Sequence, residues 1–244
     1  TGNPQNMLIG ISSGIDYATF FYKLLPVSLL GMALIVVMVR WFYPSHFGSE
    51  TVMVPNDHKF EYRFDSMKFS VPVFLGVVVM FFLGKLLHLS IPVIALTGAS
   101  FILIFGKVKP SLVIRNVDWV LLLFFASFFI VVEVAVKTGL LDFFIHSEVL
   151  TGDIGGVVKL HGLSLFLSQI VSNVPYTVMM LPVLKPMSSE ILWLSLASAS
   201  TLAGNATIIG AMANLIVIES AEKERVRIGF WEFFKIGIAA PLIS

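Results

Sequence analysis

The sequence lacks cysteine and has few charged residues, and both absences exclude whole classes of protein. Without cysteine the chain can have no disulfide bridge, no thiolate nucleophile and no cysteine-ligated metal. Charged residues make up only 13% of its 244 residues, whereas soluble domains average roughly 25%. The net charge is +1 and no basic cluster of the required size occurs, so we expect no nucleic-acid partner.

Motifs of catalysis and cofactor binding are also missing. The pattern GxxxxGK[ST] does not occur, so we expect no ATP-driven transport by this chain. An intramembrane hydrolase would need a Ser–His, Ser–Lys or paired-Asp arrangement within the apolar stretches, and we find none. The histidines have no metal-ligand spacing among them: His46, His58, His88, His146 and His161. We therefore expect no enzyme, no metal site and no cofactor, with Na⁺ as the one exception.

Apolar residues are abundant: 57% of the chain is hydrophobic, including 22 Phe. A run of about 20 apolar residues is long enough to cross a bilayer as a helix. Runs of this kind, one of them shorter, cover 22–43, 69–89, 91–105 and 118–136. Loops are expected between them at 44–68, 107–117 and 137–160. The predicted fold class is an all-α polytopic membrane protein, with the lipid bilayer as a partner.

The positions of Lys and Arg orient these spans, because cytoplasmic loops carry an excess of both. The segment 40–68 and the loop 107–117 contain Arg40, Lys59, Arg63, Lys68, Lys107, Lys109 and Arg115. Both are therefore predicted to be cytoplasmic, and the span 118–136 leads to a loop outside. We expect an integral protein of a prokaryotic cytoplasmic (inner) membrane.

The segment 161–186 allows two topologies. It is either one span broken at Ser172–Pro175 or a re-entrant hairpin that turns there and leaves on the side it entered. The basic cluster at 222–227 favours the hairpin, because a plain span would put that cluster outside. The arms of such a hairpin, about 11 and 9 residues, are each too short to cross the bilayer alone.

The stretch 190–221 is predicted to be a discontinuous helix. Gly204, Asn205 and Thr207 interrupt it near the middle of the crossing, between the flanking pieces 190–203 and 208–221. Non-helical backbone at membrane depth is tolerated where protein buries it or water reaches it. The N-termini of half-helices offer N–H groups to an anion, and their C-termini offer carbonyl groups to a cation.

The first residues, TGNPQN, repeat this pattern in the opposite direction. Gly2 matches Gly204 and Asn3 matches Asn205, and an apolar half-helix follows each pair. Inverted repeats with broken helices are the architecture of secondary transporters. We predict three regions: 1–21, the end of a first-repeat transport region; 22–117, connecting scaffold helices; and 118–244, the second inverted repeat.

Three stretches carry a resemblance to a known family: IRNVDWVLLLFFASFFIVVEVAVKTGL, SNVPYTVMMLPVL and STLAGNATIIGAMANLIVIESAEKERVRIGFWEFFKIGIAAPL. They resemble the second half of the arsenite-permease/citrate-transporter-like ion transporters, and TGNPQN resembles the end of the first half. The superfamily includes arsenite permeases, di- and tricarboxylate symporters, sodium/proton antiporters and the melanosomal P protein. The resemblance implies a homodimer with a scaffold and a mobile, elevator-like transport domain. It also implies that the N-terminal half of the protein, with the first hairpin, precedes Thr1.

Carried over position by position, the resemblance assigns a site for substrate and ion. In the second half it comprises Ser172, Asn173, Pro175, Thr177, Gly204, Asn205, Thr207 and Asn214, and in the first half Gly2, Asn3, Gln5 and Asn6. Na⁺ is expected at the Asn173 and Asn205 loops. Small polar residues also serve as packing contacts between membrane helices, and we expect that role for Ser198 and Ser200. Glu133 either pairs with Lys137 on one helix face or takes part in ion coupling.

The predicted function is secondary active transport of a small anion, arsenite-like, inorganic or a carboxylate, coupled to Na⁺ or H⁺. The alternative is a Na⁺/H⁺ antiporter of the same superfamily. A channel is less favoured, because a site built from paired broken helices suits occlusion of its cargo.

Overall fold

The computed structural model describes residues 3–44, 64–107, 109–139, 150–223 and 225–238, and these residues are almost entirely helical. They belong to two compact units. The smaller unit takes residues from 16–19 and 48–124, and the larger from 1–15, 20–47 and 125–244. Each unit is described by itself.

The smaller unit contains α3 (Phe64–Leu83), α4 (Ile91–Phe105) and the short α5 (Pro110–Arg115). α3 packs along α4, and Gly98 permits the close approach, because a Cβ there would overlap the Val77 side chain. Phe69 and Phe105 add a ring contact between the two helices, with centroids 5.9 Å apart. The unit also includes Tyr17, whose ring lies 5.4 Å from that of Phe81 and 5.0 Å from that of Phe82.

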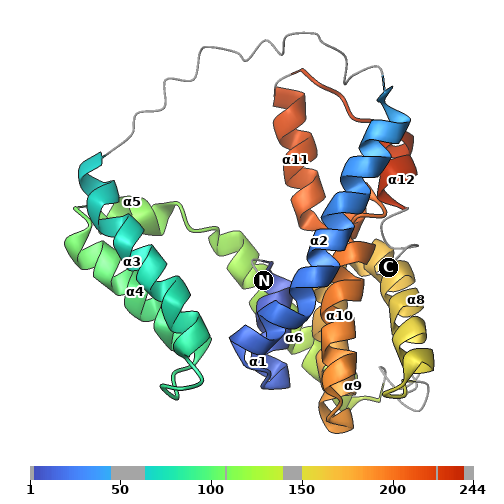
Figure 1. Cartoon of the computed structure of the whole chain (residues 1–244), viewed down its shortest axis with the longest axis horizontal. Coiled ribbons are helices and arrows are strands. Elements are labelled where there is room, and N and C mark those ends of the chain that lie inside the picture. The colour runs from blue at the N-terminus through green and yellow to red at the C-terminus, as the bar shows by residue number, and fades with distance from the viewer. Residues whose placement is uncertain (1–2, 45–63, 108, 140–149, 224, 239–244) are drawn as a thin grey trace. The chain divides into compact units, whose positions relative to one another are not determined.

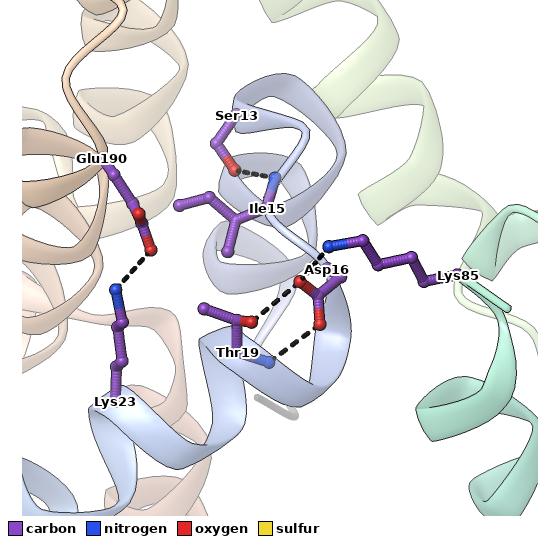
Figure 2. Close-up of polar contacts among 7 residues, drawn as sticks. All are labelled: Ser13, Ile15, Asp16, Thr19, Lys23, Lys85 and Glu190. Carbon is purple, nitrogen blue, oxygen red and sulfur yellow. Dashed lines mark hydrogen bonds and ion pairs between the residues drawn. The ribbon is translucent and has the colours of Figure 1, made fainter.

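Asp16 precedes Tyr17 and binds Thr19 in the first turn of the helix that follows (Figure 2). Its carboxylate accepts hydrogen bonds from the Thr19 N–H at 3.0 Å and the Thr19 hydroxyl at 2.8 Å, and it pairs with the Lys85 ammonium at 3.1 Å. The backbone hydrogen bond from Thr19 is the main cause that lowers the pKa of Asp16 to about 2, with the hydroxyl and Lys85 adding to it. Asp16 is therefore an ionised cap on α2 (Tyr17–Phe42).

The larger unit is built around three neighbouring helices, α8 (Ile154–Val171), α9 (Asn173–Leu184) and α10 (Glu190–Ala203), shown in Figure 1. α1 (Pro4–Ser13) packs against α9 and α10. The buried core is apolar and includes Ile9, Leu160, Tyr176, Met180, Leu184, Leu192, Trp193 and Leu196. This core holds the hairpin and the interrupted helix together.

The remaining elements of the larger unit are most of α2, most of α6 (Trp119–Lys137), η3 (Lys185–Met187), η4 (Ile208–Gly210), α11 (Met212–Lys223) and α12 (Phe230–Gly237). An ion pair between Lys23 and Glu190, 2.7 Å apart, joins α2 to α10 (Figure 2). Both side chains are about half exposed, so the pair adds little stability.

Among the residues that the structure describes, three helices are long and apolar enough to cross a membrane: Tyr17–Phe42, Ser66–Leu83 and Ile154–Val171. The first two lie at the predicted spans 22–43 and 69–89, but the second span ends at Leu83 and residues 84–88 form a turn. The predicted span 91–105 coincides with α4, and α6 lies within one residue of the predicted 118–136 at each end.

The loop predicted at 137–160 is wrong at its end, because α8 already begins at Ile154. Asp153 caps this helix by accepting the Gly156 N–H at 2.9 Å, and a Cβ at Gly156 would overlap the Thr151 backbone. The glycines therefore allow a close turn at a helix start. α8 has 18 residues, so the expectation of two short hairpin arms holds only for α9, with 12. Two other predicted loops also contain helix, since α5 lies within 107–117 and α3 begins at Phe64.

Candidate functional site

The turn between α8 and α9 consists of Ser172, which lies in an unusual backbone conformation. Its φ is +70° and its ψ is 161°, a region that costs a non-glycine residue of order 1–3 kcal/mol. Asn173, Pro175 and Thr177 follow in the first turns of α9, and all three are buried. The predicted hairpin residues therefore stand together at a buried helix start.

The interruption after α10 contacts this turn directly. α10 ends at Ala203 and α11 begins at Met212, with η4 between them. Gly204 is buried, and a Cβ there would lie 3.1 Å from the Asn173 side-chain nitrogen. The structure thus brings Asn173 and Gly204, predicted separately from two motifs, into one place.

Side-chain amides donate hydrogen bonds to the backbone carbonyl groups that lose their helical partners at the interruption. Gln169 Nε2 donates to Ala203 O at 2.9 Å, and Asn214 Nδ2 donates to Gly204 O at 2.7 Å and to Thr207 O at 3.0 Å. Ala203 O and Thr207 O each accept a second, backbone hydrogen bond, from Ala206 and Gly210 respectively. Both lone pairs of these two carbonyls are therefore used within the protein. In this conformation the Asn214 side chain links Gly204 and Thr207 across the interruption of the helix.

Gln5 joins the first-half motif to α10. Its Nε2 donates to Ser200 Oγ at 3.2 Å and to Thr201 Oγ1 at 2.6 Å. Each hydroxyl already spends its only hydrogen on a backbone carbonyl, that of Leu196 at 2.6 Å and that of Ala197 at 2.7 Å. The hydroxyls can therefore only accept from Gln5, which fixes the orientation of its amide.

Four buried side-chain atoms have no hydrogen-bond partner among the described residues, and all four are oxygens. They are Gln5 Oε1, Asn6 Oδ1, Ser168 Oγ and Thr177 Oγ1. Gln5, Ser168 and Thr177 are fully buried. Their helices are neighbours, since α9 packs against both α1 and α8. Neutral carbonyl and hydroxyl oxygens of this kind are the ligands that hard cations prefer.

Two cavities meet at Asn205. One, of about 320 Å³, lies among α1, α2 and α10 and has Asn6, Ser198, Thr201 and Asn205 among its lining residues. The other, of about 360 Å³, is lined by Asn205 together with Tyr43, Glu232 and apolar residues that include Gly237. Asn205 is thus placed to contact a molecule in either cavity.

Comparisons with known proteins decide the family. The model of a family described as citrate transporter matches residues 1–203. The chain belongs to the citrate transporter family. A 46 kDa membrane protein of Mycobacterium leprae is 29% identical over the whole chain and 60% of its own length. An uncharacterized transporter of Mycobacterium tuberculosis is 29% identical with the same coverage, and the human P protein is 30% identical over 69% of the chain and 22% of its own length.

No solved structure matches the chain. The chain spans about 60% of the length of its mycobacterial relatives. The family match ends at Ala203, the last residue of α10. Gly204, Asn205, Thr207 and Asn214 lie beyond it, whereas the mycobacterial relatives align with the whole chain.

The structure places the other predicted site residues of this citrate transporter family member in different surroundings. Asn173, Gly204 and Gln5 are buried, whereas Asn6 lines one cavity and Asn205 lines both. Asn3 starts α1 without a side-chain capping bond. Gly2 lies outside the described residues. Sequence reasoning missed Ser168 and Gln169, which resemble ordinary polar packing residues in an apolar helix.

Ser200, expected to be a packing contact, is fully buried and receives the Gln5 amide. Ser198 donates to Ser195 O at 3.1 Å, within its own helix. A packing role thus fits both hydroxyls, and Ser200 in addition connects α10 to the first-half motif.

Glu133 lies on α6, and its side chain is exposed. It pairs with Lys137 at 3.2 Å, with both side chains exposed. We expect Glu133→Gln to lower stability by about 0.3–0.5 kcal/mol, the usual worth of an exposed pair at this helix spacing, and to leave any Na⁺ response unchanged. Thermal unfolding of the full-length protein with and without Na⁺ tests this, and a lost Na⁺ response would assign Glu133 to coupling.

Proposed function

We propose that the complete protein is a secondary active transporter that moves a small anion across the membrane, coupled to Na⁺. Membership of the citrate transporter family supports membrane transport, and the buried side-chain oxygens support the coupling ion. The homodimer, the elevator-type movement and the partnership with an N-terminal half come from the family resemblance and belong to the same proposal.

The observation that carries the proposal is the surplus of buried acceptors. A buried polar group without a partner costs about 1–3 kcal/mol, and four atoms have no partner among the described residues: Gln5 Oε1, Asn6 Oδ1, Ser168 Oγ and Thr177 Oγ1. A bound monovalent cation would supply a partner to those that converge on it. None of the four groups ionises near neutral pH, so they favour Na⁺ over H⁺ as the coupling ion.

The anion would be bound by neutral groups. Amide and hydroxyl side chains line the cavity of about 320 Å³, and neither α1 nor α9 has a side-chain cap hydrogen bond at its first turn. An anion held in this way is bound through single hydrogen bonds and not through ion pairs.

A Na⁺/H⁺ antiporter is the second candidate, and one observation favours it. No basic residue lines either cavity in the part of the chain that the structure describes. If Na⁺ itself is the cargo, no anion site is needed.

The experiment is thermal unfolding of the purified full-length protein in detergent, with NaCl compared with choline chloride at equal ionic strength. Citrate, arsenite, phosphate and sulfate are then added singly to each. A ligand of the folded state raises stability by RT ln(1 + [L]/Kd). We expect Na⁺ to stabilise the protein, and one anion to add to this only when Na⁺ is present.

Other outcomes decide against the proposal. Stabilisation by Na⁺ alone, with no further effect of any anion and with loss at low pH, establishes the antiporter. If no concentration of Na⁺ changes the unfolding temperature, the proposal of Na⁺ as the coupling ion is overturned.

A further inference from the structure

Gln169 is the residue that connects the hairpin to the interrupted helix. It lies on α8, directly after Ser168 and close to the turn at Ser172. Its Nε2 uses both hydrogens on carbonyl groups, those of Leu165 and Ala203, each at 2.9 Å. Its Oε1 accepts the Thr207 hydroxyl at 2.7 Å. One side chain therefore contacts the interrupted segment at two points.

The contact with Thr207 has a defined direction. Thr207 Oγ1 accepts the Gly210 N–H at 3.1 Å, so its own hydrogen remains free to be donated to Gln169. Gly210 is close to the same amide, since a Cβ there would lie 2.7 Å from Gln169 Oε1. The segment from Ala203 to Gly210 thus lies directly against Gln169, and the Thr207 hydroxyl both donates and accepts a hydrogen bond there.

Asn205 lies between the two contact points, Ala203 and Thr207. It lines both cavities, and its position depends on where these two neighbours are held. On the other side, Ser168 carries one of the unpartnered oxygens. Gln169 therefore lies between an unpartnered oxygen of the hairpin and the two contacts that flank Asn205.

We propose that Gln169 is a positioning residue that couples cation binding at the hairpin to the placement of Asn205. This inference rests on the proposed function, because it requires that Na⁺ binds there. Protein groups fill both donors and one of the two acceptor lone pairs of the Gln169 amide, so we assign Gln169 to holding the interrupted segment and not to binding Na⁺ or cargo. Its role is to make the two binding regions respond to each other, as a coupling free energy between sites requires.

The test is an isosteric double-mutant cycle in the full-length protein, with Gln169→Met, Thr207→Val and the double variant. The readout is the Na⁺ concentration that gives half of the maximal thermal stabilisation. We expect each single variant to raise this concentration about tenfold. The double variant should be no worse than the weaker-binding single, because both changes remove the hydrogen bond between Thr207 Oγ1 and Gln169 Oε1.

Two further variants separate positioning from general damage. Thr207→Ser keeps the hydroxyl and should keep the wild-type Na⁺ midpoint. Ser220→Ala removes an exposed hydroxyl that donates to Ile216 O at 2.8 Å and should have no effect. If Gln169→Met does not fold, the comparison of Thr207→Val with Thr207→Ser decides alone.

The two hypotheses fail in different ways. A wild-type protein that responds to Na⁺ while Gln169→Met and Thr207→Val keep its midpoint overturns the role of Gln169 and leaves the proposed function intact. A wild-type protein that does not respond to Na⁺ overturns the proposed function, and with it this inference.

Discussion

Replacing Thr177 with valine should stabilise the Na⁺-free protein and abolish its stabilisation by Na⁺. The Thr177 hydroxyl is fully buried and has no partner among the described residues. Valine keeps the branched shape and removes a group whose burial costs about 1–3 kcal/mol. A gain of this size raises the unfolding temperature by about 2–4 °C for each kcal/mol in a protein of this length. The cation, in contrast, loses a ligand.

The opposite signs of the two effects make the prediction specific. Thermal unfolding in choline chloride measures the first effect, and the increment on adding NaCl measures the second. A variant that is damaged in a general way would lose stability in both buffers. If Thr177→Val keeps the full Na⁺ increment, Thr177 is not a ligand and the buried oxygens need another explanation.

Tyr176→Phe is the matched control, one residue away on α9. The Tyr176 hydroxyl is fully buried too, but it accepts a hydrogen bond from Ser164 Oγ at 2.9 Å. Its removal leaves Ser164 without its acceptor and should destabilise the protein by about 1–3 kcal/mol. The Na⁺ increment should stay at the wild-type value, since this hydroxyl is already paired within the protein.

Ser164 and Ser168 illustrate what the sequence could and could not predict. Both are buried serines on α8, one helical turn apart, and nothing in the local sequence distinguishes them. Ser164 meets the tyrosine hydroxyl, whereas Ser168 meets no partner among the described residues. The difference depends on which helices pack around α8, and only the structure contains that information.

The helices themselves were largely predictable, because apolar composition over about 20 residues reflects the thermodynamics of the bilayer. α4 coincides with its predicted run, and α10 ends at Ala203, directly before the predicted interruption. The start of α8 was not predictable in this way, since its cap includes Gly155 and Gly156, which in most contexts indicate a loop. Their role depends on a backbone contact with Thr151 that forms only in the fold.

Several of the predicted site residues contact one another in the structure, and these contacts were not predictable from the sequence. Thr207 and Asn214 were expected to bind substrate or ion, and in the structure Thr207 Oγ1 accepts the Gly210 N–H while Asn214 Nδ2 donates to Gly204 O and Thr207 O. Polar residues at mid-membrane can serve the backbone or a ligand, and sequence patterns are the same in the two cases. A count of hydrogen-bond partners is needed to separate them.

Gly237→Ala should disrupt the candidate site at Asn205 by a clash from α12. Gly237 is the last residue of α12 and lines the cavity of about 360 Å³ together with Asn205. A Cβ at Gly237 would overlap the main-chain carbonyl oxygen of Asn205. A backbone atom cannot rotate away as a side chain can, so α12 or the Asn205 segment must move. Such overpacking typically costs about 1–3 kcal/mol.

Whether Gly237→Ala raises or lowers the stability of the protein identifies the cause of the change. In a helix, alanine is intrinsically preferred over glycine by about 0.5–1 kcal/mol, so helix propensity alone predicts a more stable protein. Gly162→Ala on α8 is the control, because a Cβ there meets nothing within 4 Å, and it should show that gain. We expect Gly237→Ala to lose stability and, because Asn205 is displaced, to lose the further stabilisation by an anion in the presence of Na⁺. If Gly237→Ala instead behaves like Gly162→Ala, the close packing of α12 on Asn205 does not hold the site in place.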